Sequence, residues 1–555
     1  MQFKQTLVRL SLLLIPYISF SQTNYLSQGA QENLLLERLE ILAQKDSVLN
    51  FSKTRPFSRR HFMPYINRLD TIKGLTEVDR YHLLNANVSN IEWTDISRDS
   101  LLSRKPIGRF FQTPATLYEV HAKDFFLAVN PVFQYYVGIE KDNDQHIFLN
   151  TRGISLRGRI ADKIGFAAYV TDNQERDPLY VQQWENERKA VPGQGFYKDF
   201  KQTGYDYFDA RGYITFNVAK YIDVAFGYDR NFIGNGYRSL FLSDFSNSTL
   251  FLKLNTRIWK FNYQNIFMEL QNADRSGADV LIPKKYAAMH HLDLAVTRWL
   301  NIGLFEGVIF GRPDRFEFGY LNPVIFYRSL EQQHGSFDNA VAGMDFKANV
   351  AKKAQFYGQF LLDEFNLTEL RKGSGWWANK FAYQLGVKGV NVFDIKNLDL
   401  QLEYNRVRPF TYSHRDSVAN YTHYNQPLAH PLGANFSEWI GNVRYQPAPK
   451  WFMQLTAMYA VQGKDTGNIN YGGNIFLPNV PPYRNAEFGY EVGGGIKQKT
   501  GYASLLVSYQ WKPNLFFEVN LVNRTTSATI IQPSTNTLVV YAGIRWNMHR
   551  REFVF

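Results

Sequence analysis

Three segments of the chain combine charged, amide, aromatic and glycine residues at spacings that suit a ligand rich in hydroxyl groups. They cover residues 228–238, 311–323 and 430–435. Tyr and Trp rings can stack on the apolar faces of sugars, and Asn, Asp and Arg side chains can make paired hydrogen bonds with hydroxyl and carboxylate groups. The candidates for such contacts, or for lining a lumen, are Asp229, Arg230, Asn231, Arg312, Asp314, Arg315, Asn322, Arg328, His430 and Asn435.

Each of these residues also has a structural alternative. Arg and Asp side chains inside large β-barrels commonly form salt-bridge networks that stiffen the wall. The choice between binding and structure therefore depends on the elements that carry the three segments.

No catalytic or metal site is predicted. The sequence contains no Gly-x-Ser-x-Gly motif and no cysteine, which excludes a nucleophile elbow, thiol catalysis, disulfides and thiolate metal sites. His290 and His291 are adjacent in a strand-like stretch, so they point to opposite faces and cannot chelate one ion together. Asp142 and Asp144 lack the rest of a calcium-binding loop. A barrel enzyme with a nucleophile and a base near its rim is kept as an alternative.

The composition indicates an exported protein that folds without membrane-spanning helices. The chain has 555 residues, 16% of them aromatic, and a formal net charge of +12. Beyond the N-terminal leader, no stretch approaches the roughly 20 apolar residues of a spanning helix. The positive charge is not gathered into a Lys/Arg cluster or a nucleic-acid motif, so we expect anionic lipopolysaccharide or an acidic polysaccharide to balance it.

Residues 1–21 are typical of a secretory signal peptide. Lys4 and Arg9 supply the positive start, an apolar run follows over 10–20, and Ser19-Phe20-Ser21 fits a cleavage site of small residues. The alternative, an N-terminal anchor helix, is disfavoured because the run has about half the length of a span.

A helical head is predicted for residues 22–95. Leu35, Leu36, Leu39 and Leu42 recur at helical spacing within 31–44. A second helix is expected after Ser58, carrying Phe62, Ile66 and Leu69, and a third after Thr76, where Asp79 completes a capping box. Residues 96–113 show no period and are predicted to be a linker.

From residue 114 to the C-terminus the period changes to two. Apolar and polar residues alternate in 125–139, 398–405, 503–511, 515–523 and 538–546. A soluble sandwich would bury the apolar face, whereas an outer-membrane barrel turns it toward lipid. Polar residues in strand after strand, and aromatics at strand ends, favour the barrel: Tyr221, Tyr228, Trp259, Trp299, Tyr404, Trp451, Trp511 and Trp546.

The C-terminus and the length of this region support the same architecture. The chain ends in Glu552-Phe553-Val554-Phe555, and a final strand that closes on a terminal Phe resembles the signal by which outer-membrane barrels are recognised. At roughly 25 residues per strand and connection, residues 114–555 give about 18 antiparallel strands, with 16 as the alternative. The predicted fold class is an all-β transmembrane barrel with a small N-terminal periplasmic α-helical bundle.

Several motifs resemble a known family. Asp229-Arg230-Asn231, followed by Gly234, Gly236 and the run 239–243 (Ser-Leu-Phe-Leu-Ser), resembles a segment of the Wzi family, outer-membrane proteins that help to hold capsular polysaccharide on the cell surface. The segments 321–328 and 430–435 are similar to versions of that family in Bacteroidota, and 35–59 is similar to its N-terminal bundle.

The resemblance implies an 18-stranded barrel that is closed by a periplasmic helical bundle and binds as a lectin without catalysis. Similar Bacteroidota proteins are assigned to gliding motility under the name RemB, so the resemblance implies that role as an alternative. It implies no individual ligand contacts, because polysaccharide-binding loops differ with the polysaccharide.

We therefore predict an outer-membrane, lectin-like protein that binds surface polysaccharide and supports capsule or exopolysaccharide attachment. The expected partners are surface or capsular polysaccharide, outer-membrane lipids with lipopolysaccharide, and other envelope proteins. No cofactor, metal or nucleic acid is expected. A passive porin-like channel or solute transporter is the other alternative, and an open lumen would favour it.

Overall fold

A computed structural model describes residues 24–66, 72, 74–94, 97, 111–161, 163–272, 282–312, 317–335, 338–466, 469–529 and 534–555. The predicted signal peptide, Leu69 and most of the predicted linker lie outside these ranges. The candidate residues Asp314 and Arg315 also lie outside them. Among the helices of the described residues, none has both the length and the apolar character to cross a bilayer.

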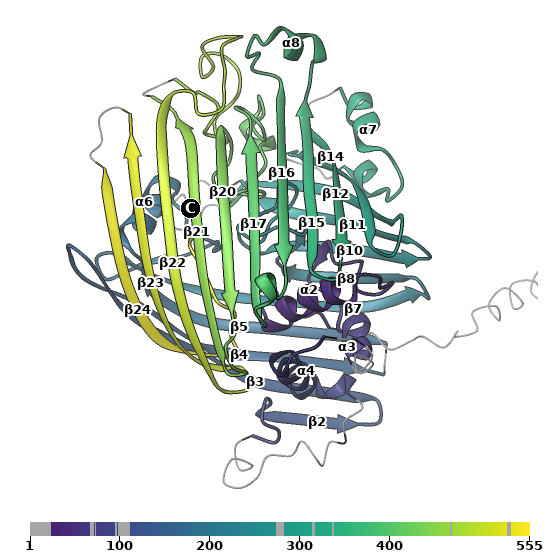
Figure 1. The fold of residues 1–555 in the computed structure, drawn as a ribbon. Coiled ribbons are helices and arrows are strands. Elements are labelled where there is room, and N and C mark those ends of the chain that lie inside the picture. Colours follow the sequence, from purple (N-terminus) through teal and green to yellow (C-terminus); the bar gives the residue numbers. More distant parts are fainter. Residues whose placement is uncertain are drawn as a thin grey trace, which may run out of the picture.

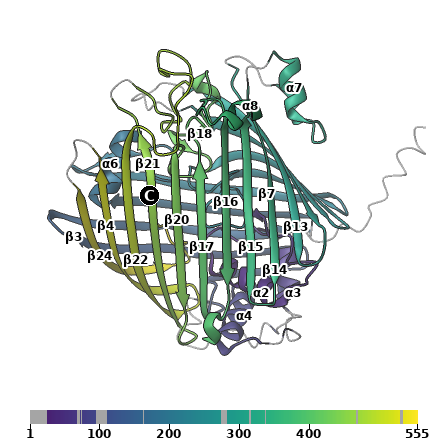
Figure 2. The ribbon, with the colours of Figure 1, turned by 45° about the horizontal axis from the view of Figure 1, so that its top comes forward.

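Eighteen antiparallel strands of the described residues close into a barrel (Figure 1, Figure 2). The seam is formed by the last strand and the first long one, with Trp546 opposite Phe133. A short additional strand, β2 (Tyr118–Ala122), pairs with residues 125–129 of β3, and the last strand pairs with residues 133–140 of β3. The barrel strands are β3 (Phe125–Glu140), β4 (Asn143–Ile160), β5 (Ile164–Arg176), β7 (Gly204–Ala219), β8 (Ile222–Asp229), β10 (Thr249–Ile258), β11 (Phe261–Gln271), β12 (Lys284–Ala295), β13 (Leu300–Phe310), β14 (Asn339–Val350), β15 (Ala354–Glu364), β16 (Lys380–Gly389), β17 (Leu398–Val407), β20 (Phe436–Tyr445), β21 (Trp451–Lys464), β22 (Ile496–Lys512), β23 (Leu515–Ala528) and β24 (Thr535–Trp546).

Apolar side chains face outward from this barrel and polar ones face its lumen. In β17, Leu402 is 49% exposed, whereas the next residue, Glu403, is fully buried and accepts a hydrogen bond from Tyr357 of β15. Phe517 and Val519 of β23 are likewise exposed on either side of the buried Glu518. The alternation therefore belongs to an inside-out barrel, which confirms the predicted fold class and excludes the soluble sandwich.

One end of the barrel has short turns and carries the helical head. The turns at this end include 259–260, 351–353 and 513–514, and in bacterial barrels short turns lie on the periplasmic side. Three exposed aromatics of the predicted girdle, Trp259, Trp451 and Trp511, lie at the same end.

The head contains the three predicted helices, α2 (Gln31–Ala43), α3 (Arg59–Ile66) and α4 (Glu77–Ser89). The capping box at the start of α4 is confirmed, because Thr76 Oγ1 accepts from the Asp79 amide at 3.1 Å and the Asp79 carboxylate accepts from the Thr76 amide at 2.8 Å. The helices share a core of Leu36, Leu39, Phe62, Met63 and Ile66. Figure 1 shows them against the end of the barrel that carries the short turns.

Ion pairs hold the head to the lumen wall. Lys53 Nζ lies between two buried wall carboxylates, 3.1 Å from Asp293 Oδ1 and in contact with Asp345. The reverse polarity also occurs, with Lys347 of β14 2.6 Å from Glu40 of α2. Because Lys53 and Glu40 of the head each meet buried opposite charges of the wall, these parts of the head and the lumen are electrostatically complementary.

The strand that follows Lys53 continues into the lumen. There β1 (Thr54–Arg55) forms a two-stranded antiparallel sheet with β9 (Phe232–Ile233), which belongs to the long connection between β8 and β10. The head and an inward-folded loop thus share backbone hydrogen bonds inside the barrel.

The C-terminus also lies inside the barrel, and the expectation of a final strand closing on Phe555 is wrong. The last strand ends at Trp546, and residues 547–555 turn back into the lumen. Arg550 binds Glu518 at 2.7 Å, and Arg551 binds Glu175 at 2.8 Å. These guanidinium groups would be costly on a lipid-facing strand, so the tail turns toward the lumen carboxylates.

Removal of the Lys53 ammonium should loosen the head. Lys53→Ala leaves Asp293 and Asp345 buried without their cation, which we expect to cost about 3 kcal/mol of head docking. Limited proteolysis of the purified barrel should then cut the head faster, and planar-bilayer recording should show current that the wild type lacks. Lys45→Ala, which changes an exposed lysine of the head, is the control. Equal protease resistance of all three proteins, or steady current through the wild type, would contradict the docking described here.

Head docking should weaken as the pH falls. Burial lowers the pKa of His82 in α4 from 6.5 to about 4, and its ring contacts Gln446 of a periplasmic turn at 3.2 Å. The docked head disfavours protonated His82. Neutral His82 therefore contributes fully to the free energy of docking above pH 6.5, and this contribution, about 3 kcal/mol in total, is lost as the pH falls toward 4. A fluorophore on Lys45→Cys, in a chain without native cysteine, should lose anisotropy between pH 7.5 and 4.5. His82→Asn should flatten this profile, and an unchanged profile would refute the assignment.

Candidate functional site

The first candidate segment lies inside the lumen, at the junction of wall, head and inward loops. Asp229 ends β8, and its carboxylate accepts from the Arg230 amide at 2.8 Å. The Arg230 guanidinium donates to the Gly193 carbonyl. The backbone carbonyl of Arg230 accepts from the Gln28 side chain of the head at 2.9 Å. Asn231 Oδ1 accepts from Lys253 Nζ at 3.1 Å. These contacts place all three residues where the head and the loops meet.

Arg230 also lines a central cavity of about 330 Å³. The head, the wall, the inward loops and the C-terminal tail all contribute to its lining. Basic side chains outnumber acidic ones there, so the cavity favours an anion. Its charged residues are Arg55, Arg230, Arg238, Lys388, Arg444, Arg550, Arg551, Glu37, Asp244 and Glu552.

His430 and Asn435 of the third candidate segment make hydrogen bonds with other residues inside the barrel. His430 is fully buried and lies 2.7 Å from Glu438, which also binds Arg238 at 3.0 Å. Burial lowers the pKa of His430 despite this carboxylate.

Asn435 holds three stretches of backbone together. Its amide nitrogen donates to the carbonyls of Gly463 at 3.3 Å, Tyr471 at 3.1 Å and Gly494 at 3.0 Å, and its oxygen accepts from the Gly493 amide at 2.8 Å. The contacts of His430 and Asn435 support the structural alternative for both residues.

The second candidate segment leads outside the barrel. Arg312 makes a bidentate pair with Asp338 at 2.7 and 2.9 Å, and the hydrogen bond to Asp338 raises the pKa of Arg312. The residues that follow, 317–335, form what we call the outer strap, which contains η4 (Phe318–Leu321) and α7 (Tyr327–Gln333). Figure 2 shows α7 outside the wall. Asn322 and Arg328 are exposed on this strap, so they do not line the lumen, and their role as polysaccharide contacts stays a prediction.

The outer strap covers polar groups on the lipid side of the wall. Glu306 of β13 accepts from the amides of Tyr327 and Arg328, both at 2.9 Å. The Tyr327 ring packs 3.9 Å from that of His290, while His291 faces Asp345 in the lumen, as the alternation predicts. An uncovered carboxylate on this face would be costly in lipid, so the strap stabilises the outer wall.

A further cluster, missed in the sequence, lies at the end of the barrel opposite the head. We call it the rim platform: Trp376, Trp377, Tyr483, Arg484, Glu487 and Phe488. It joins the β15–β16 connection, which contains α8 (Leu367–Lys372), to the β21–β22 connection. Figure 1 shows α8 at this end.

Charged and aromatic groups of the rim platform are fixed against one another. Trp377 Nε1 donates to Glu487 at 2.8 Å, and the Arg484 guanidinium lies 4.2 Å from the Trp377 ring centroid. Arg484 also binds Glu487 at 2.7 Å and lowers its pKa. Tyr483 and Phe488 remain 41% and 52% exposed. Flat exposed rings beside oriented charged groups are suited to sugar binding.

Two signals in the sequence mark the rim platform. A Trp doublet follows Gly373-Ser374-Gly375 between two alternating strands, and Pro481-Pro482 precedes Tyr483 and Arg484 in a long connection. Bulky aromatics in turn-forming sequence cannot be explained by the alternation of a strand.

The family comparison agrees with this geometry. The sequence profile of the family described as "Capsule assembly protein Wzi" matches residues 157–531, more than half of the chain. The chain belongs to the Wzi capsule assembly family. The matched region includes all three candidate segments and the rim platform. As a Wzi-family barrel with an apolar outer face, the protein resides in the bacterial outer membrane, as predicted.

One solved structure has the same fold. Wzi of Escherichia coli, described as an outer membrane protein involved in group 1 capsule assembly and as a carbohydrate-binding β-barrel, matches with a TM-score of 0.56 and 14% identity. The match covers 96% of this chain and 100% of that one. Pseudomonas aeruginosa OprD, at a TM-score of 0.41 and 10% identity, covers 75% and 94% of the two chains. Acinetobacter baumannii OccAB2, at 0.41 and 10%, covers 76% and 98%. No curated protein matches this sequence significantly.

Loss of the Glu306 carboxylate from the wall should release the outer strap. Glu306→Ala removes the acceptor of two α7 amides, and hydrogen bonds to a charged group contribute about 1.5–3 kcal/mol each. We expect chymotrypsin to cleave the detergent-solubilised variant near Tyr327 faster than the wild type. Ser329→Ala, at an exposed position of the same helix, should cleave at the wild-type rate. If Glu306→Ala is as resistant as the wild type, Glu306 does not hold the strap.

Proposed function

We propose that this Wzi-family protein binds a surface polysaccharide at the rim platform and so supports attachment of capsule or exopolysaccharide to the cell. The single observation that carries the proposal is the rim platform itself, with exposed rings and a fixed Arg–Glu–Trp arrangement at the end of the barrel opposite the periplasmic head. A polymer outside the cell meets this end first.

The relative of known structure supports the same class of ligand. Escherichia coli Wzi is described as a carbohydrate-binding barrel involved in capsule assembly. At 14% identity the individual contacts do not transfer, so the contacts proposed here are those of this chain.

The filled lumen argues against a channel. The head, the β8–β10 connection, residues 408–435 and the tail all place side chains inside the barrel, and a continuous apolar core there includes Phe241, Tyr412, Tyr421 and Phe436. These segments occupy the volume that a porin leaves to water. We therefore propose binding in preference to transport, and binding in preference to catalysis.

Loss of exposed rings should release the polysaccharide. Stacking on one aromatic ring contributes about 1 kcal/mol, so Tyr483→Ala with Phe488→Ala, the two exposed rings of the platform, should weaken binding by about tenfold or more. The measurement is cell-associated against shed polysaccharide in a strain that carries only the variant. Phe393→Ala, which removes an exposed ring at the periplasmic end, is the matched control.

The same assay separates the alternatives. Wild-type retention by the double variant at normal barrel abundance would refute the rim platform as the site. Loss of retention by Arg230→Ala alone would move the site to the central cavity. Surface motility scored beside retention tests the gliding role that the resemblance implies.

A further inference from the structure

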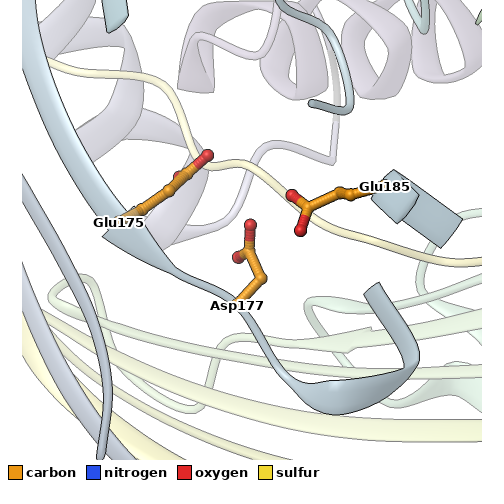
Figure 3. A group of neighbouring side chains, drawn as sticks. All are labelled: Glu175, Asp177 and Glu185. Carbon is orange, nitrogen blue, oxygen red and sulfur yellow. The ribbon is translucent and has the colours of Figure 1, made fainter. Parts of the chain in front are cut away.

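Three carboxylates meet inside the barrel, near the start of α6 (Leu179–Arg188). Glu175 is the penultimate residue of β5, Asp177 follows that strand, and Glu185 lies two turns into the helix. Each offers an oxygen, and these oxygens all lie within 4.8 Å of one another. Figure 3 shows Asp177 and Glu185 pointing toward each other, with Glu175 beside them.

This group is deeply buried, and three of its oxygens have no hydrogen-bond partner among the described residues. Glu175, Asp177 and Glu185 are 1%, 6% and 1% exposed. Both oxygens of Glu185 and Oδ2 of Asp177 find no hydrogen-bond partner among the described residues. A buried, unpaired carboxylate is strongly unfavourable, so an additional partner is needed.

The charges of the group indicate what that partner is. Arg551 of the C-terminal tail pairs with Glu175 at 2.8 Å and, among the described residues, is the cation that acts most strongly on both Asp177 and Glu185. Three carboxylates and one guanidinium leave two negative charges without compensation. A single divalent cation balances them.

Protons are the competing partner. Burial, with repulsion from the neighbouring carboxylates, raises the pKa of Asp177 to about 8 and that of Glu185 to about 11. A cation at this position therefore has to displace protons, and its binding weakens as the pH falls.

We propose that Glu175, Asp177 and Glu185 form a structural site for one divalent cation, with calcium as the preferred ion. Oxygen atoms up to 4.8 Å apart suit calcium, which accepts carboxylate oxygens at about 2.3–2.6 Å in flexible geometry. Magnesium requires a tighter octahedron and retains several waters, which an enclosed site disfavours.

The bound ion would join three parts of the molecule. Glu175 belongs to the wall, Glu185 to the helix inside the lumen, and Arg551 ties Glu175 to the tail. The same helix packs Tyr180 and Trp184 against Phe555, with ring centroids 6.1 and 5.4 Å away. The ion thus fixes α6 and the tail, and through them the filling of the lumen.

The test uses the full mature chain, refolded in detergent without lipopolysaccharide and stripped with EDTA. Isothermal titration with calcium chloride should show one saturable site per chain in the wild type. Asp177→Asn and Glu185→Gln should each weaken it by at least about tenfold, because each removes a ligand charge. Glu187→Gln, an exposed carboxylate on the same helix, should bind as the wild type does. Heat-modifiable mobility on gels verifies that every variant is a folded barrel.

Three results would overturn the proposal. One is no saturable calcium binding by the wild type up to roughly 10 mM, beyond the affinity range of extracellular calcium modules. Another is equal affinity in Glu185→Gln and the wild type, and the third is equal loss in Glu187→Gln. Magnesium chloride in place of calcium chloride tests the preferred ion, and tighter magnesium binding would refute calcium. Because neither Tyr483 nor Phe488 belongs to the carboxylate group, failure here leaves the rim platform untouched.

Discussion

The structure depends on compensation of charge inside a barrel whose outer face is committed to lipid. Since the outer face of the strands is mostly apolar, the acids, bases and amides of the strands mostly face the lumen. The head places opposite charges against this wall, and Lys53 forms ion pairs with Asp293 and Asp345. Each partner alone would leave a charge buried and unpaired, so the head and the wall stabilise each other.

The same constraint explains why other segments leave the positions expected of loops. The C-terminal tail brings Arg550 and Arg551 to Glu518 and Glu175, and the inward loop brings Arg238 to Glu438. On the outside, the strap covers Glu306, a carboxylate on the lipid face. Polar groups that the strands cannot satisfy are thus satisfied by connections that fold back, on whichever side the group lies.

The periodic elements could be predicted from the sequence because period two and period 3.6 determine which face is buried. The strands containing 398–405 and 515–523, and the capping box of Thr76 and Asp79, all formed as expected. The connections could not be predicted in the same way. A loop exposed to solvent and a loop that fills a polar lumen have the same mixture of Arg, Asn, Gly and Tyr, so the sequence could not distinguish Asn435 as a backbone anchor from Asn435 as a ligand. Two features related to the connections do leave a signal in the sequence. Glu306 is a carboxylate on the apolar face of a strand, and the Trp376–Trp377 doublet places indoles in a turn, so both depart from the local pattern.

The position of the tail sets an order of events in biogenesis. Residues 547–555 leave the last strand at the periplasmic mouth and run upward between head and wall, where His549 lies against Gly29. The head therefore reaches its final contacts only once residues 547–555 have entered the lumen, so correct seating of the head depends on the path of this segment.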